Sequence, residues 1–508
     1  MSSFNGRIID QNFLSCNSLK MKEFSIFNLR FLIFNILLAI SLLTGCKARS
    51  DTPPPPAHLL GHLPASAKEQ TLVLYPEVTG NLMPDLTGVC YVPFGHTDLV
   101  REIDPGLMLF DQIFDLVIPV TRDAKGRIQQ DLSALDGYLE GVTGSGARPL
   151  ISLDFTPTVL SSLPHLENSI RRSVPPVSYE DWEQLVYEVV RYVVREKQVD
   201  AAYWSVWNEP DLGMFWNVEH SPYTNRAAIA RGSDLWTPFR MRTGAAGQFN
   251  ELGRMVEYMR LYEATVRGVR RADPTARVGG PNTSSFRERW IAVFLNQCAE
   301  RGLPVDFVAW HYPGYPEEMR ANMAWLQETS AKAGIETPAV VITEWNADHG
   351  NGWDSWTETL ESLDIIEGMA SSGVEAAFYY TVGRLILTDT HTISPLGTAF
   401  QNLSMLQGRQ IKCETTAGSG ALATQDADGV IRAFLWSQAA DPERISILPG
   451  IGADLGSFTS YSLNIYRENA PLMTYTGVLE QDGVVSVTLP GGGRRMVTVV
   501  FHTGRQMP

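Results

Sequence analysis

The sequence predicts a (β/α)8 barrel followed by an antiparallel β-sandwich. One observation is a pair of apolar runs that each end in a glutamate, residues 203–207 shortly before Glu209 and residues 338–343 directly before Glu344. Uncharged runs rich in aromatic and β-branched residues are typical of strands buried on both faces of a parallel sheet. A second observation is that apolar runs alternate with amphipathic stretches through the middle of the chain, as βα units do. From Ile411 onward the pattern changes to short alternating runs, which predicts the sandwich.

Eight barrel strands are predicted in order along the chain. They are Gly88–Pro93, Asp115–Val120, Pro149–Phe155, Tyr203–Asn208, Ala276–Pro281, Asp306–His311, Ala339–Glu344 and Val374–Tyr380. Helical patterns fill the gaps, most clearly at Tyr179–Glu196 and Phe249–Arg271, where apolar residues recur every three or four positions. A doubly wound open sheet would require a glycine-rich phosphate loop after an early strand, and no G-x-G-x-x-G or Walker sequence stands there.

The N-terminal region has the pattern of a secretory signal peptide. Basic residues precede the apolar run Phe31–Leu43, which is shorter than the roughly 20 residues that span a bilayer, so a transmembrane helix is the weaker interpretation. Leu43-Thr44-Gly45-Cys46 resembles the bacterial lipoprotein cleavage box, in which the cysteine carries the lipids. We therefore expect Cys46 to anchor the protein at the bacterial cell envelope, periplasmic or surface, with a plain signal peptide as the alternative. Met21 would make a more ordinary start than Met1.

Four regions follow from these patterns. Residues 1–45 form the signal peptide, residues 46–70 a proline-rich tether, residues 71–410 the barrel and residues 411–508 the sandwich. A short strand at Thr71–Tyr75 has no obvious place in the barrel, and we expect it to pack with the sandwich.

Composition excludes several classes of function. The chain has 508 residues, 44% of them hydrophobic and 19% charged, which is enough for one large core and a smaller one. The net charge of −15 argues against nucleic-acid binding, which requires a basic surface. The five cysteines lack C-x-x-C spacing, and the nine histidines form no H-x-H or H-E-x-x-H cluster. We therefore expect no metal, no cofactor and at most one disulfide.

The two glutamates at strand ends suggest carbohydrate chemistry. In a barrel the active site lies at the C-terminal strand ends, where the fourth and seventh strands face each other, so Glu209 and Glu344 could flank one bond of a ligand. Paired carboxylates cleave glycosidic bonds, with one protonated as the acid and the other ionised, and retaining enzymes hold them about 5–5.5 Å apart. The structural alternative is that each glutamate caps a helix or pairs with an arginine.

The residues around the two glutamates resemble glycoside hydrolase family 39, the β-xylosidase and α-L-iduronidase family of retaining barrel enzymes. The resemblance spans roughly residues 85–410 and rests on an ordered set of motifs: WNEPDL at 207–212, VGGP at 278–281, DFVAWHYP at 306–313 and ITEWN at 342–346. It implies that Glu209 is the acid/base, that Glu344 is the nucleophile, and that the fold is the clan's barrel.

The resemblance also implies which residues touch the sugar. Asn208 resembles the donor to the 2-hydroxyl, and His311 and Tyr312 resemble residues that contact the sugar or position the nucleophile. Tyr315 could fill the same role as Tyr312. Three further aromatic residues could form a stacking platform or could be ordinary core: Trp216, Trp345 and Tyr380.

Two departures from the family pattern concern the sugar-binding subsite. The family's second strand usually ends in an Arg-x-His element that contacts the sugar, for which Arg122 or His96 could substitute here. The eighth strand has Phe378-Tyr379-Tyr380-Thr381 where a tryptophan is common. The resemblance therefore supports the two catalytic glutamates and does not identify the particular substrate.

The sequence therefore predicts a retaining glycosidase that cleaves the O-glycosidic bonds of xylosides or related oligosaccharides and touches the membrane only through its lipid anchor. The alternative is a carbohydrate-binding lipoprotein that kept the barrel and lost turnover. Release of phenol from aryl glycosides separates the two. The oligomeric state stays open.

Overall fold

The computed structural model describes residues 69–92, 94–218, 246–347, 355–437, 444–450, 458–479, 483–488 and 493–503. These residues all belong to one compact unit. The expected signal peptide, the tether and Cys46 lie outside the described residues. Within the described ranges, none of the helices combines the length and the apolar character that crossing a bilayer requires.

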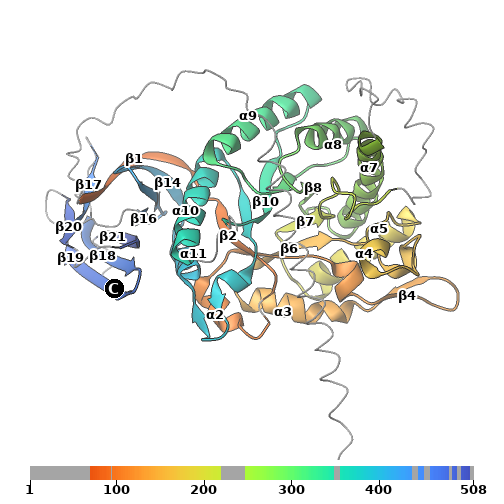
Figure 1. Cartoon of the computed structure of the whole chain (residues 1–508), viewed down its shortest axis with the longest axis horizontal. Helices are drawn as coiled ribbons and strands as arrows, with labels where there is room; N and C mark the ends of the chain where they lie inside the picture. The colour runs from red at the N-terminus through yellow and green to blue at the C-terminus, as the bar shows by residue number, and fades with distance from the viewer. Residues whose placement is uncertain are drawn as a thin grey trace, which may run out of the picture. The chain divides into compact units, whose positions relative to one another are not determined.

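The barrel is closed by eight parallel strands, as predicted (Figure 1). In barrel order they are β2 (Asp85–Cys90), β3 (Leu107–Phe110), β6 (Arg148–Leu153), β7 (Tyr203–Val206), β8 (Val278–Thr283), β9 (Phe307–His311), β10 (Ala339–Trp345) and β11 (Ala376–Tyr379). Pairing of β11 with β2 completes the ring. The strands are almost wholly buried, which explains why they read as continuous apolar runs in the sequence.

The predicted second strand, Asp115–Val120, is wrong. The second barrel strand is β3, and residues Ile113–Val117 form a single π-helical turn. A small hairpin follows, in which β4 (Val120–Arg122) pairs with β5 (Ile128–Gln130). The predicted run contains Pro119, which has no backbone N–H to donate to a neighbouring strand of a central sheet. It also begins with the buried carboxylate of Asp115, which pairs with Arg172. The four residues of β3 have neither problem and are all buried.

Helices surround the barrel strands, as Figure 1 shows for α8, α9 and α10. The helices of the described ranges are α2 (Thr97–Ile103), α3 (Asp136–Gly144), α4 (Asn168–Arg171), α5 (Tyr179–Arg191), α7 (Ala246–Ala272), α8 (Glu288–Arg301), α9 (Pro316–Ala333), α10 (Ser355–Ser372) and α11 (Pro395–Ser404). The clearest sequence prediction, α5, begins where the Ser178 hydroxyl accepts a hydrogen bond from the Asp181 amide at 3.0 Å. Its apolar stripe is buried, which confirms the helical periodicity.

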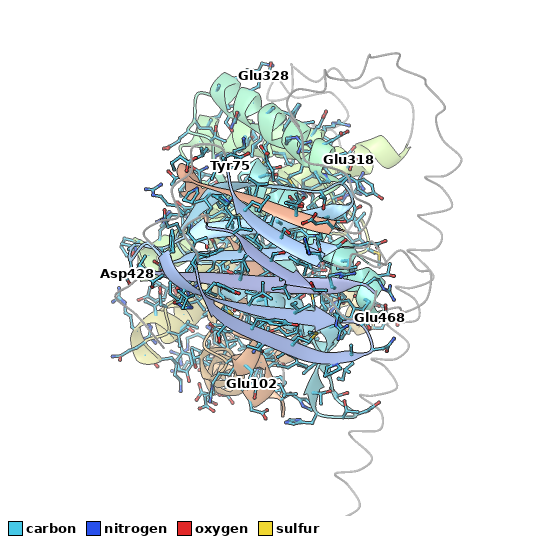
Figure 2. The ribbon with its side chains drawn as sticks, turned by 90° about the vertical axis from the view of Figure 1, so that its left-hand side faces the viewer. Tyr75, Glu102, Glu318, Glu328, Asp428 and Glu468 are labelled. Atoms are coloured by element: carbon cyan, nitrogen blue, oxygen red, sulfur yellow. The ribbon has the colours of Figure 1, made fainter. Side chains whose placement is uncertain are left out.

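A second, mostly antiparallel sheet contains nine strands. Their order is β19 (Ala470–Val478), β18 (Phe458–Arg467), β21 (Arg495–Thr503), β16 (Ile431–Ser437), β15 (Ser419–Gln425), β14 (Arg409–Thr415), β1 (Glu69–Leu82), β17 (Arg444–Pro449) and β20 (Val485–Thr488). Figure 2 faces this sheet and labels Tyr75, which lies on β1 and donates its hydroxyl to Glu414 at 3.0 Å.

The position of β1 confirms that the early strand joins the C-terminal sheet. It pairs antiparallel with β14 and parallel with β17, so it lies between strands from the other end of the chain. Residues 71–82 consequently belong to the sheet, and the barrel begins at Asp85.

The sheet also contacts the barrel helices. The Trp436 indole donates to Asp364 on α10 at 2.7 Å, and the Thr498 hydroxyl donates to the Asn402 amide oxygen on α11. Trp436 and Met496 pack in the same apolar cluster as the barrel core, whereas the opposite face of the sheet has a core of its own. The sheet thus shares side chains with the barrel.

Candidate active site

Glu209 lies three residues beyond the end of β7, where the backbone leaves its ordinary conformations. Trp207 and Glu209 have φ angles of 67° and 47°, in the left-handed region that residues with side chains rarely adopt. The Glu209 amide donates to the Asn282 carbonyl at 2.9 Å, so the loop is fixed to the end of β8. Glu209 is 8% exposed. The apolar β7 thus delivers a carboxylate to the mouth of the barrel, as the sequence predicted.

Asn282, at the end of β8, connects the strands that carry the two glutamates. Its side-chain amide donates to the Trp207 carbonyl at 2.7 Å and to the Ser205 hydroxyl, both of the β7 segment. Its amide oxygen accepts from the Thr343 hydroxyl of β10 at 3.3 Å. Asn282 is 2% exposed, and both its amide nitrogen and its amide oxygen have hydrogen-bond partners, so its role is to position the strand ends.

His311 brings the two glutamates together. It pairs in register with Glu344 across β9 and β10, and the Tyr312 amide donates to the Glu344 carbonyl at 2.8 Å. The His311 Nδ1 atom lies 3.3 Å from Glu209 Oε1 and 3.7 Å from Glu344 Oε2. These two carboxylate oxygens therefore cannot be farther apart than 7.0 Å, the sum of the two distances.

Burial and mutual charge shift the pKa values of this group. Burial lowers the pKa of His311, but the charge on Glu344 and the hydrogen bond and charge of Glu209 outweigh it and raise the pKa to about 9. Burial raises the pKa of Glu344 to about 7, although the His311 charge opposes this. Near neutral pH His311 is therefore an imidazolium that lies against both glutamate side chains.

The sequence neighbours of Glu344 do not keep its pKa low. Thr343 donates to Asn282 and to the Trp310 carbonyl, and not to the Glu344 carboxylate. Successive side chains of a strand point to opposite faces, so the neighbours in sequence are not neighbours in space. His311 on the adjacent strand supplies the stabilising charge instead.

Four of the predicted sugar-contacting residues have accessible side chains. Asn208 and Tyr380 are partly exposed, and Tyr312 and Tyr315 are 40% and 58% exposed. Tyr315 lies at the N-terminus of α9, where its amide donates to Glu318 at 3.1 Å. These four side chains are therefore available to a ligand.

Two predicted platform residues, Trp216 and Trp345, are core residues. Trp216 is fully buried, packs edge to face on Trp207 at 4.5 Å and donates its indole to the Arg254 carbonyl at 3.0 Å. Trp345 is 2% exposed and packs on Tyr379 at 4.9 Å. Neither ring presents a free face, so of the two alternatives the ordinary core applies to both residues.

Three residues at the barrel mouth escaped the sequence prediction. Tyr91 follows β2 and packs edge to face on Tyr380 at 5.6 Å. Asp111 follows β3, and Asp154 follows β6. Burial, and to a smaller extent the Asp111 charge, raises the pKa of Glu344, Tyr91 and Tyr380. The sequence contains a signal for Asp111, because like Glu344 it is an acidic residue that follows an apolar run.

The two proposed substitutes for the family's Arg-x-His element contact residues other than the two glutamates. Arg122 is on β4, where it pairs with Asp181 at 3.1 Å. His96 precedes α2 and contacts His391 through the two Nδ1 atoms at 3.3 Å. The second barrel strand ends instead in Asp111 and Gln112, so the corresponding position carries an acid.

The described part of the chain contains no group of three or more His, Cys, Asp or Glu side chains that could hold a metal ion. Cys90, Cys298 and Cys413, the cysteines in that part, are all free thiols.

Comparison with protein families gives a match to the model of glycosyl hydrolases family 39 over residues 109–227 and 246–341. The match contains Glu209 and His311 and ends just before Glu344. A β-xylosidase of Caldicellulosiruptor saccharolyticus is 27% identical over 334 residues, which are 58% of this chain and 60% of the relative. A β-xylosidase of Geobacillus stearothermophilus is 29% identical over 181 residues, 35% of this chain and 29% of the relative. The matches thus span less than two thirds of these relatives.

Solved structures share the fold over most of the chain. The GH39 enzyme from Xanthomonas axonopodis pv. citri has a TM-score of 0.63 at 19% identity and covers 87% of this chain and all of its own. A monomeric β-xylosidase from Caulobacter crescentus CB15 has a TM-score of 0.62 at 16% identity, with 85% of this chain and 99% of its own covered. At these identities the likeness concerns the fold, a barrel with an added sheet.

Proposed function

We propose that the chain is a retaining glycosidase of glycoside hydrolase family 39 that acts on xylosides or related oligosaccharides, and its motifs and the family-model match support this. The observation that carries the proposal is the shared contact of Glu209 and Glu344 with His311, which limits their oxygens to a separation of 7.0 Å. This upper limit for one oxygen of each carboxylate is compatible with the roughly 5–5.5 Å between the carboxyl groups of retaining enzymes. Two relatives named as β-xylosidases support the choice of sugar.

Hydrolysis proceeds in two displacements. Glu344 attacks the anomeric carbon and forms an ester to it, while the bond to the leaving oxygen breaks and Glu209 gives that oxygen its proton. Water then attacks the same carbon, Glu209 takes the proton of the water, and the bond to Glu344 breaks. Two inversions at one carbon give net retention.

His311 makes this division of roles workable. Its imidazolium lies within 3.7 Å of both carboxylates and favours an ionised Glu344 in a site whose burial opposes charge. When Glu344 becomes a neutral ester in the intermediate, the imidazolium remains next to Glu209. In this second step Glu209 acts as the base that accepts a proton from water.

Azide rescue tests the assignment. Glu344→Gly should abolish turnover, and added azide should give a glycosyl azide of inverted configuration. Glu209→Ala should keep the first step for substrates with good leaving groups, accumulate the intermediate, and give an azide of retained configuration. Glu328→Ala is the control, because this glutamate lies on α9 and its side chain is 66% exposed (Figure 2). An inverted product from the wild-type enzyme by NMR, or azides of the opposite configurations, would refute the roles.

A panel of aryl glycosides tests the activity itself. The wild-type protein should release phenol from xylosides or related glycosides. A protein that melts at a higher temperature with oligosaccharide but releases no phenol would be a binding protein on the same barrel.

The location is part of the proposal. The Leu43-Thr44-Gly45-Cys46 sequence supports a lipid on Cys46 that tethers the enzyme to the bacterial envelope through residues 46–70. Cys46→Ser should change its membrane fractionation and remove the lipid mass from the N-terminal peptide. The lipid anchor would be contradicted if the Cys46→Ser variant fractionates like the wild type and the wild-type N-terminal peptide carries no lipid.

A further inference from the structure

Asp111 occupies the end of the second barrel strand, beside the candidate catalytic pair. β3 lies between β2 and β6, and Asp111 is the first residue after it. The Tyr91 amide donates to the Leu109 carbonyl at 2.8 Å, so the ends of β2 and β3 lie side by side at the mouth. Asp111 thus comes from the same rim of the barrel as Glu344 and Tyr380.

The Asp111 carboxylate is poorly satisfied by protein groups. Both of its oxygens lie 3.4 Å from the Gln112 side-chain nitrogen, a long contact for a charged acceptor. The nearby Arg172 is engaged with Asp115 at 3.3 Å and with the Gln112 side-chain oxygen at 2.5 Å. Among the described residues Asp111 forms no ion pair, which leaves hydrogen-bonding capacity for a ligand.

Asp111 is crowded by protein and yet accessible. Burial raises the pKa of Asp111 to about 6. The hydrogen bond from Gln112 and the charge of Arg172 lower this pKa, and the charge of Asp115 raises it. The Asp111 side chain nevertheless keeps part of its surface open, as does that of Glu344. After burial, the Asp111 charge contributes to the raised pKa of Glu344, Tyr91 and Tyr380. All four residues lie at or just beyond the C-terminal ends of barrel strands, so they belong to one rim of the barrel.

We propose that Asp111 accepts a hydrogen bond from a hydroxyl group of the sugar bound beside Glu344, and that it makes the site select neutral sugars over uronic acids. This inference rests on the proposed glycosidase function and names the substrate class of its site. A sugar hydroxyl is a donor that suits an under-used carboxylate. A sugar carboxylate would meet the like charge of Asp111, while the cations nearby, Arg172 and His311, are held by other carboxylates.

The test compares deoxygenated substrates with Asp111 variants. The kcat/KM values of 4-nitrophenyl β-xyloside and its 2-, 3- and 4-deoxy forms are measured for wild type, Asp111→Ala and Asp111→Asn. In the wild type, removal of the hydroxyl that Asp111 binds should cost at least about tenfold, as expected for a hydrogen bond to a charged group. In Asp111→Ala the same removal should cost at least about tenfold less, because the partner is already gone. Equal deoxygenation ratios in wild type and variant at every position would overturn the contact.

Asp115→Asn is the matched control. Asp115 belongs to the same acidic group, but its carboxylate faces Arg172 and Asn168, so the variant should lower the melting temperature and leave all three deoxygenation ratios at wild-type values. A change of ratio in Asp115→Asn equal to that in Asp111→Ala would assign the effect to general loosening and overturn the proposal.

The substrate class is tested on the wild type with 4-nitrophenyl β-glucuronide in the same assay. A higher kcat/KM for the xyloside is expected, and cleavage of the glucuronide alone or equally fast would overturn the selectivity while leaving the glycosidase function in place. If neither these nor any other aryl glycoside is cleaved, the glycosidase proposal itself fails, and the inference about Asp111 fails with it.

Discussion

Replacement of His311 by glutamine should move the acidic limb of the pH–rate profile upward. The imidazolium lies 3.7 Å from Glu344, and two unit charges at this distance interact by about 4–5 kcal/mol at an effective dielectric constant of about 20. Since about 1.4 kcal/mol corresponds to one pKa unit, even a third of this interaction shifts the Glu344 pKa by about one unit. The shift is upward because the positive charge that favours the ionised carboxylate is lost.

The expected loss of activity depends on pH in a way that fixes its cause. With the pKa of Glu344 at about 7, roughly a tenth of the enzyme has this carboxylate ionised at pH 6. A pKa of about 8 would leave roughly a hundredth, so the loss of kcat/KM should be about fivefold larger at pH 6 than at pH 8 and about eightfold larger than at pH 9. A variant that had merely lost packing would lose activity evenly across the pH range.

The assay is kcat/KM for an aryl glycoside from pH 4 to 9, with His391→Gln as control. His391 contacts Asp98 and His96 and is half exposed, so its replacement should leave the acidic limb unchanged. If the acidic limb of His311→Gln stays in place or moves to lower pH, the electrostatic role given to His311 is refuted.

Three further outcomes follow from the contacts. Burial and the Asp364 charge raise the pKa of Glu367 to about 7, so the free energy of unfolding falls progressively as pH rises from about 4.5 through 7. At pH 8 the Glu367→Gln variant should therefore have a free energy of unfolding roughly 1–2 kcal/mol higher than wild type, after allowance for partial exposure. At pH 4 it should show no such gain. Trp216→Ala should cost about 3–5 kcal/mol in chemical unfolding, and a cost under 1 kcal/mol would contradict its place in the core. Asn282→Ala should lower kcat more than it raises KM, because it removes the side-chain bond to the Trp207 carbonyl in the segment that carries Glu209; an unchanged kcat would remove its positioning role.

Most of the barrel follows from the sequence because its strands obey one simple rule. Seven of the eight predicted strands overlap the observed ones, since each is an apolar run that is buried on both faces. The exception was the second strand, where two apolar runs compete within a few residues. The run at Leu107–Phe110 is shorter, and only the tertiary structure shows that Asp115 leaves the sheet to pair with Arg172.

The sequence predicts the functional residues that stand at the end of an apolar run. It does not predict residues whose role depends on hydrogen bonds to other strands. Glu209, Glu344 and His311 end apolar runs, so their meeting at one rim follows from the barrel. Asn282 ends a strand too, but its function is to bond to β7 and β10, which sequence distance conceals. The burial of Trp216 and Trp345 likewise depends on neighbours from elsewhere in the chain.

The backbone gives an independent argument that the mouth of the barrel is under functional constraint. Trp207, Glu209, Asn282 and Tyr312 all have positive φ angles, and all of them lie at or just beyond the ends of β7, β8 and β9. Each such residue costs of order 1 kcal/mol or more and persists only where other contacts determine its conformation. Here the Glu209 amide bonds to the Asn282 carbonyl, which joins two of these residues, and the Tyr312 amide bonds to the Glu344 carbonyl. The same bonds set the positions of the two carboxylates around His311, so the strain is concentrated where the proposed reaction requires fixed geometry.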